Sequence, residues 1–184
     1  MDGAPRATSI ACLLAAVGVA AMAVPAWVTG MPVVVASLGA SVLLAAVDSD
    51  HPESAPMTVI TGHWIAIAAA LVSLEALGLW DAPSTLVAGV TWTRMLALPL
   101  ALALTLLGML VVGRLHTPAG ATALLVASSI VRPGTDLVVL AGSVAYVAGV
   151  IALFPSVAAR LAGGHATSAA PKRKRRARTK RRGR

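Results

Sequence analysis

The chain has 184 residues, of which 58% are hydrophobic and only 12% are charged, and its mean hydropathy is +0.84. Soluble globular domains are about 45–50% apolar and about 25% charged, so this composition excludes a soluble enzyme. The net charge of +8 comes largely from one segment, because ten of the fifteen basic residues lie between Lys172 and Arg184. The remainder carries five basic and seven acidic residues, a net charge of −2. A lone cysteine, Cys12, excludes a disulfide framework.

Long stretches without charged residues predict membrane-spanning helices. A helix needs about 20 apolar residues to cross a hydrocarbon core about 30 Å thick. Four segments reach that length and two more are apolar but short. The long segments are residues 8–28, 58–80, 94–114 and 136–157, and the short ones are 32–47 and 118–131. We therefore expect an all-α fold, a polytopic membrane helix bundle of four long and two short helices in two repeats.

The two short segments allow two arrangements. Each begins near a proline, Pro32 or Pro118, and proline suits the first turn of a helix because its missing N–H would be unpaired there anyway. We favour half-helices that dip into the bilayer and return to the same side. Full but short spans are the alternative.

An internal similarity links the short segments. Residues 39–46 read Gly-Ala-Ser-Val-Leu-Leu-Ala-Ala, and residues 120–127 read Gly-Ala-Thr-Ala-Leu-Leu-Val-Ala. The match pairs Gly39 with Gly120 and Ser41 with Thr122, and each copy has a long segment on both sides. This favours two long–short–long units, as in many small transporters. The units would be parallel if the short segments re-enter, and inverted if all six segments cross.

The basic segment predicts the orientation of the chain. Positive residues next to the last span belong in the cytoplasm, so we expect a multi-pass protein of the inner cell membrane with a cytoplasmic C-terminus. Residues 1–160 would form the transmembrane domain and residues 161–184 a disordered basic tail. The tail would attract anionic lipid headgroups. It has no aromatic residues for base stacking, so we do not expect nucleic acid as its partner.

Three motifs carry a resemblance to a known family. They are Ala36–Ser41, Ser54–His63 with its Pro-to-Gly-His stretch, and Leu115-His116-Thr117-Pro118 followed by small residues ending in Ala-Leu-Leu. Together they resemble the HPP family of integral membrane proteins over about residues 25–155. The chain departs from the family pattern at Thr117, where a proline is usual, and at Met57-Thr58, where Arg-Asn is usual. Plant relatives are taken to carry nitrite, so the resemblance implies a small-anion transporter or channel.

The predicted site combines this resemblance with helix electrostatics. Half-helices would present unpaired N–H groups and partial positive charge at their N-termini, which suit an anion. We expect the substrate-binding residues to be His116, Thr117, Gly120, Thr122, Gly39 and Ser41. His63 and Glu75 are expected proton carriers, because ionisable groups within the membrane are often functional. Arg94 is expected to extend towards the membrane interface.

The function expected from the sequence is passage of a small anion such as nitrite, either passive or proton-coupled. The chain has no HExxH, no paired intramembrane aspartates and no Gly-x-Ser-x-Gly turn, so we expect neither an enzyme nor a metal or cofactor. Homo-oligomerisation would add protein around the pathway of so short a chain. The alternative is a membrane scaffold that transports nothing and whose tail recruits lipid, a cytoplasmic partner or nucleic acid.

Overall fold

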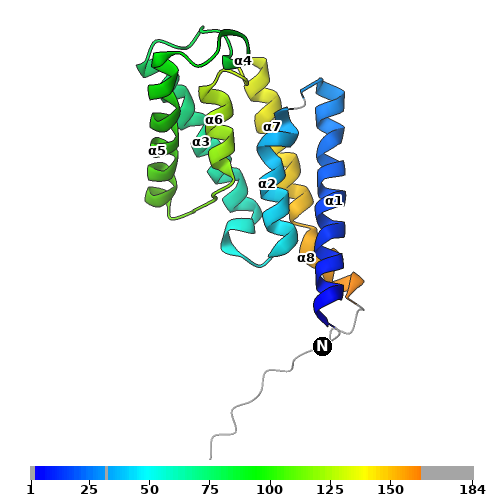
Figure 1. Ribbon diagram of the computed structural model, residues 1–184. Coiled ribbons are helices and arrows are strands. Elements are labelled where there is room, and N and C mark those ends of the chain that lie inside the picture. The colour runs from blue at the N-terminus through cyan, green and yellow to red at the C-terminus, as the bar shows by residue number, and fades with distance from the viewer. Residues whose placement is uncertain (1–2, 32, 163–184) are drawn as a thin grey trace, which may run out of the picture.

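The computed structural model describes residues 3–31 and 33–162, and every regular element in this part of the chain is helical. Figure 1 shows the elements: α1 (Gly3–Thr29), α2 (Val33–Val47), the 3₁₀ turn η1 (Pro52–Ser54), α3 (Pro56–Ala76), α4 (Thr85–Ala88), α5 (Trp92–Val112), α6 (Ala119–Ala127), α7 (Thr135–Ile151) and α8 (Phe154–Leu161). The all-α prediction is confirmed. The predicted tail lies outside the described residues, apart from its first two.

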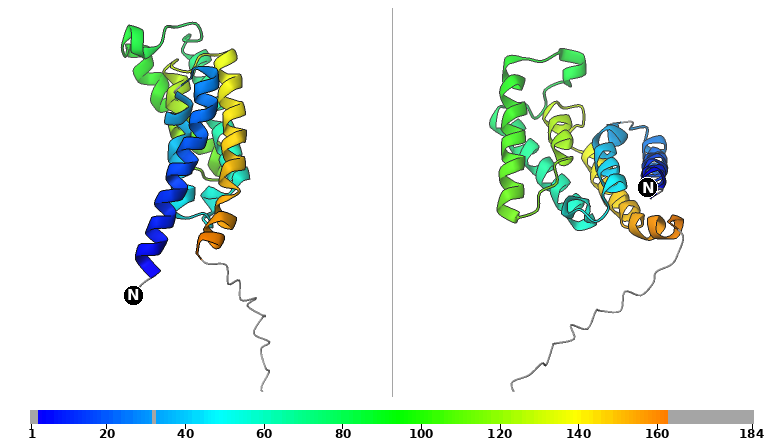
Figure 2. Two further views of the ribbon diagram at one scale, coloured as in Figure 1. Left: turned by 90° about the vertical axis from the view of Figure 1, so that its right-hand side faces the viewer. Right: turned by 60° about the horizontal axis from the view of Figure 1, so that its bottom comes forward.

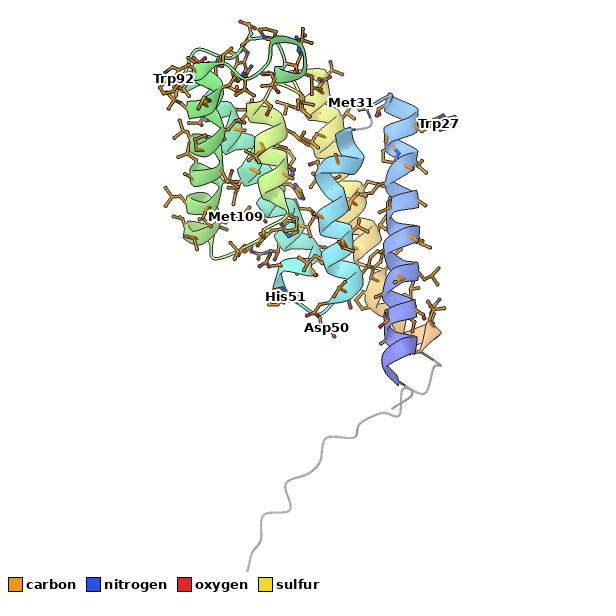
Figure 3. All side chains as sticks on the ribbon, in the orientation of Figure 1. Trp27, Met31, Asp50, His51, Trp92 and Met109 are labelled. Atoms are coloured by element: carbon orange, nitrogen blue, oxygen red, sulfur yellow. The ribbon has the colours of Figure 1, made fainter. Side chains whose placement is uncertain are left out.

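Four helical stretches are long and apolar enough to cross a membrane, as predicted: Ala7–Thr29, Pro56–Ala76, Trp92–Val112 and Thr135–Leu161. Figure 3 gives the two ends of the bundle. Asp50 and His51 lie at what we call the lower end, and Trp27, Met31 and Trp92 lie at the upper end. The start of α1 and the last described helix, α8, both lie at the lower end (Figure 1).

The favoured half-helix arrangement of the short segments is wrong. α2 carries the chain from the upper to the lower end, and α6 carries it from the lower to the upper end (Figure 1). A re-entrant helix would return the chain to the end it came from. With 15 and 9 residues, α2 and α6 measure about 22 and 14 Å. The alternative of short crossings therefore describes both segments.

The two long–short–long units run in opposite directions. α1, α2 and α3 go up, down and up, whereas α5, α6 and α7 go down, up and down (Figure 1). This is the inverted form of the predicted repeat. α2 and α6 are neighbours near the middle of the bundle, and both contact elements of the other unit: α2 packs against α7, and α6 packs against α3.

The apolar core surrounds this middle region. One buried cluster joins α1, α2 and α7 through residues such as Met22, Leu38 and Val144. A second joins α3, α5, α6 and α7 through residues such as Leu74, Ala97 and Leu140. α1 and α5 lie at opposite edges of the bundle (Figure 2), and both expose many large apolar side chains, as lipid-facing helices do.

Local signals place two connections together at the lower end. Pro56 starts α3 at a position where a missing N–H costs nothing. Gly113 ends α5 in the left-handed conformation (φ 68°, ψ 27°), which glycine adopts without strain. The chain then runs from Gly113 to α6 beside η1. These two connections bring Glu53 next to His116 and Thr117.

Candidate functional site

A buried polar cluster lies where α2, α3 and α6 meet. It consists of Ser37 and Ser41 from α2, His63 from α3, His116 from the turn before α6, and Thr122 from α6; we call these five residues the histidine cluster. All five side chains are fully buried. Both units of the inverted repeat contribute to it. Polar side chains within membrane helices are costly unless they are hydrogen-bonded to one another, so such a cluster is a candidate functional site.

His63 is held between the two repeat-related hydroxyls. Its Nε2 lies 3.0 Å from Ser41 Oγ, and its Nδ1 lies 2.7 Å from Thr122 Oγ1. Thr122 also shares a hydrogen bond with Ser37. Ser41 and Thr122, which occupy equivalent positions in the sequence repeat, thus bond to the two nitrogens of one imidazole ring.

His116 forms the other half of the cluster. Its Nε2 lies 2.9 Å from Ser41 Oγ, and its Nδ1 lies 2.8 Å from the main-chain oxygen of Glu53. The two imidazole rings are 5.1 Å apart, edge to face. A Cβ atom added at Gly62 would lie 2.6 Å from His116 Cβ, so only glycine at position 62 lets the ring pack this closely against α3.

The main-chain carbonyl of Glu53 determines where the protons of the histidine cluster lie when His116 is neutral. Because the Glu53 oxygen only accepts, the neutral His116 ring carries its proton on Nδ1 and accepts at Nε2. Ser41 must therefore donate its single proton to His116, and it accepts from Nε2–H of His63.

The assignment extends to the far end of the cluster. With its proton on Nε2, His63 accepts at Nδ1 from the Thr122 hydroxyl, and Thr122 accepts from Ser37. Each proton has one place, and the two histidines are opposite tautomers. Every hydrogen bond in the series is donated in the same direction, from Ser37 at one end to the Glu53 oxygen at the other.

The cluster is closed. Among the described residues, no buried side-chain nitrogen or oxygen lacks a hydrogen-bond partner. An open groove of about 470 Å³ between α5 and the start of α6 is lined by Thr117 and Gly120 but by none of the histidine cluster. The structure is thus a state in which the polar groups satisfy one another.

His116 lies outside the four long helices, and its surroundings favour a neutral ring. Burial lowers the pKa of His116, while the hydrogen bond to Glu53 and the negative charge of that residue oppose this effect. The Glu53 carboxylate itself accepts a hydrogen bond of 2.8 Å from the main-chain N–H of Thr117. The proton positions given above are those of this neutral ring.

The structure brings together only part of the predicted site. His116, Thr122, Ser41 and His63 all belong to the cluster. Thr117 directly follows His116 in the chain, but it is exposed, and its main-chain N–H donates to the Glu53 carboxylate.

Three predicted residues lie apart from the cluster. Gly39 lies near Met22 and Gly120 near Leu102. Glu75 is exposed, twelve residues or about 18 Å along α3 from His63, and faces the hollow near Trp80.

The expected anion site between two helix N-termini is wrong. α2 begins at the upper end and α6 at the lower end, so the two N-termini do not meet (Figure 1). The first N–H groups of α6 are also occupied, because those of Ala119, Gly120 and Ala121 donate to carbonyls three residues earlier. Side chains, and not helix ends, form the polar centre.

Arg94 does not extend to the interface, because only 2% of it is exposed. Its guanidinium donates to the carbonyl oxygens of Ala127 (2.5 Å), Pro83 (3.2 Å) and Ala82 (3.4 Å) and to Ser129 Oγ (2.7 Å). It thus binds the C-terminal end of α6 to the 82–83 segment at the upper end. A planar group with five donors suits this task.

Sequence reasoning missed Ser37, Glu53 and the role of Arg94. Ser37 could have been found, because it lies four residues before Ser41 and so shares its face of α2. Glu53 acts through its main-chain oxygen as well as its carboxylate, and no residue pattern announces a main-chain contact.

Comparison with known families agrees with the motifs. The family described as HPP, transmembrane region, matches residues 2–168. No curated protein and no solved structure matches the chain. The family match contains every residue of the histidine cluster, together with Glu53 and Arg94. The protein therefore belongs to the HPP transmembrane region family.

Proposed function

We propose that this membrane protein carries a small inorganic anion, such as nitrite, across the inner cell membrane, with its C-terminus in the cytoplasm. The observation that carries the proposal is the histidine cluster itself. Three hydroxyls and two imidazoles, from three helices and the turn before α6, are buried together between inverted three-helix units. Transporters built from inverted repeats bind their substrates at this kind of junction.

The chemistry of the cluster suits an anion with oxygen atoms. Ser37, Ser41 and Thr122 can each turn a hydroxyl proton towards a negatively charged oxygen. In the closed state these protons are donated within the cluster. An arriving anion would replace one of these internal acceptors, so binding requires the contacts between α2, α3 and α6 to loosen. Nitrite is the first anion to test, because the motifs resemble those of plastid relatives taken to carry it.

The test is nitrite influx into proteoliposomes that contain the full chain and an internal nitrite-sensitive reporter. The assay runs near pH 8 against empty liposomes, because nitrous acid crosses bilayers unaided. We expect saturable flux above the lipid leak. His116→Ala and Thr122→Val should reduce it at least tenfold, because each removes a group that bonds within the cluster.

Two control variants make the result specific. Thr122→Ser keeps the hydroxyl and should retain most of the flux. Ser143→Ala removes a buried hydroxyl that bonds only to Val139 within α7, so it should behave like the wild type. Flux equal to that of empty liposomes for nitrite and for a panel of small anions would refute the proposal.

The rival function, a scaffold that acts through its basic segment, makes the opposite prediction. Ten basic residues between Lys172 and Arg184 would bind anionic lipid at about 1 kcal/mol for each residue near the surface. Deleting residues 171–184 should leave anion flux intact if the chain is a transporter. A scaffold would lose partner or lipid binding on that deletion and would tolerate His116→Ala.

A further inference from the structure

The histidine cluster offers an anion no permanent positive charge. α2 and α6 bring only hydroxyls to it, and α3 brings His63. The buried Arg94 is committed to carbonyl oxygens at the upper end of the bundle. Burying an anion without a compensating charge is costly. The two imidazoles are therefore the groups in the cluster that can supply the missing charge.

Protonation of His116 would also change what Ser41 can do. In the neutral cluster the Ser41 hydroxyl donates to Nε2 of His116, so its proton is occupied. If a proton adds to that Nε2, both rings present N–H groups to the Ser41 oxygen. The Ser41 oxygen then accepts from both rings, and its own O–H must turn to another acceptor. An anion oxygen is such an acceptor.

The proton would reach His116 from the lower end. Its ring is hydrogen-bonded to half-buried Glu53, and the neighbouring Thr117 and Arg114 are exposed. On the other side of the cluster, Ser37 is fully buried, and so is Val34, which is nearer to the upper end. The titratable groups recorded against the His116 ring are His63 and Glu53. Arg114 lies exposed two residues earlier in the chain, whereas Ser37 and Val34 give the cluster no exposed side chain towards the upper end.

We propose that the anion binds together with one proton, which is taken up at His116 from the lower end and frees the Ser41 hydroxyl for the anion. The step is balanced: one proton leaves hydronium or water at the lower end, one N–H bond forms on the imidazole, and the charge of the imidazolium offsets that of the anion. This inference rests on the proposed function and adds the coupling ion, the group that holds it and the side from which it comes.

Proton uptake on nitrite binding tests the coupling directly. Nitrite is mixed with the solubilised full chain at pH 8 in weak buffer containing a pH dye, and nitrite binding is measured in parallel. We expect about one proton to be taken up for each nitrite bound, and nitrite affinity to rise up to about tenfold for each unit of falling pH.

Variants of Ser41 separate the hydroxyl from the fold. Ser41→Ala should abolish both nitrite binding and proton uptake, and Ser41→Thr should restore them because it keeps the hydroxyl. Ser143→Ala should match the wild type. Thermal unfolding of each variant shows whether a loss comes from the site or from the fold. A folded Ser41→Ala protein that binds nitrite with one proton would overturn the role given to the hydroxyl.

The side of uptake is tested in oriented proteoliposomes. Vesicles are sorted by the accessibility of the basic C-terminal segment to trypsin, and pH is varied between 7 and 9 on one side at a time. After subtraction of the flux in empty vesicles, nitrite flux should respond to pH at the lower end alone. A response from the upper end alone, or from both sides equally, would overturn the proposed direction.

The outcomes distinguish this inference from the function on which it rests. Nitrite binding without proton uptake would refute the coupling and leave anion transport standing. Failure of the chain to bind or carry nitrite or any other small anion would refute the proposed function, and the coupling with it.

Discussion

Two buried polar centres lie towards opposite ends of α6, and they differ in the partners they use. At the upper end, Arg94 donates mainly to main-chain carbonyls near the ends of helices and turns. Nearer the lower end, the histidine cluster bonds mostly from side chain to side chain, between α2, α3, α6 and the turn before α6. Arginine is always a donor and always charged, whereas hydroxyls and imidazoles can exchange donor and acceptor roles. The first centre fixes the fold, and the second can change state.

The largest loss of stability should come from removing the Arg94 guanidinium at the upper end. Arg94→Met leaves the carbonyl oxygens of Ala127 and Pro83 without their donor, and should lower the free energy of unfolding by more than about 3 kcal/mol. Arg94→Lys keeps the charge but not the planar fork, so it should recover only part of the loss. Thermal unfolding in detergent measures both. A wild-type midpoint for Arg94→Met would mean that the upper centre contributes no stability.

A smaller loss should follow from crowding the histidine cluster. Gly62→Ala places a methyl group 2.6 Å from His116 Cβ and should lower the free energy of unfolding by about 1–3 kcal/mol. Because the imidazole must move, we also expect a loss of anion flux in protein that is still folded. Gly142→Ala is the control, since a Cβ there meets nothing within 4 Å. Equal flux for both variants would show that the position of His116 does not matter for transport.

Acid should separate the two centres, because only one of them contains groups that titrate near neutral pH. The pKa of His116 is lower in the folded protein than in the unfolded chain, where it is about 6.5, so the unfolded chain takes up the proton first. The stability contributed by the neutral ring is full above pH 6.5 and is lost as pH falls below it. One such group changes the free energy of unfolding by at most about 1.4 kcal/mol per pH unit.

The comparison is made by unfolding at pH 7.5 and at pH 5.5. The wild type should be less stable at pH 5.5, and His116→Gln should show a smaller difference between the two pH values. A pH dependence that is the same in both proteins would assign the acid sensitivity to other groups.

The smallest effect should come from Glu75. It is exposed and about 18 Å along α3 from His63, so Glu75→Gln should change stability by less than about 0.5 kcal/mol. The proton-carrying role expected from the sequence would require a loss of pH-dependent flux. Side-by-side flux measurements at pH 7 and pH 8 decide between the two expectations.

The sequence predicts the membrane helices well, because apolar length is a one-dimensional property. Gaps between charged residues are enough to find both ends of α3 and α5, and the start of α7, to within four residues. The direction of the short helices is a different matter. Pro32 and Pro118 fit a half-helix and a short crossing equally, because a proline marks where a helix begins and not where it ends.

The candidate site was found in part, and for a physical reason. The repeat and the motif identify Ser41, His116 and Thr122. Ser41 bonds directly to His116, and His63 joins Ser41 to Thr122. Gly39 and Gly120 share the motif but lie on other faces of their helices, since residues two apart on a helix point in different directions. Arg94 was misjudged because its acceptors are carbonyl oxygens, which every sequence contains and no sequence pattern distinguishes.

The shortness of α6 bears on the lipid around it. Its 9 residues cover about 14 Å, less than half of an ordinary hydrocarbon core, while the adjacent α5 has 21 residues and spans about 32 Å. Backbone that is not helical is tolerated at membrane depth only against protein or water. Leu115 and Thr117 are exposed and not helical just before α6. This segment would therefore need water beside it, which a locally thinner bilayer would supply. The thickness of the surrounding membrane would then set how deep the histidine cluster lies, and lipids with shorter acyl chains would bring it closer to water.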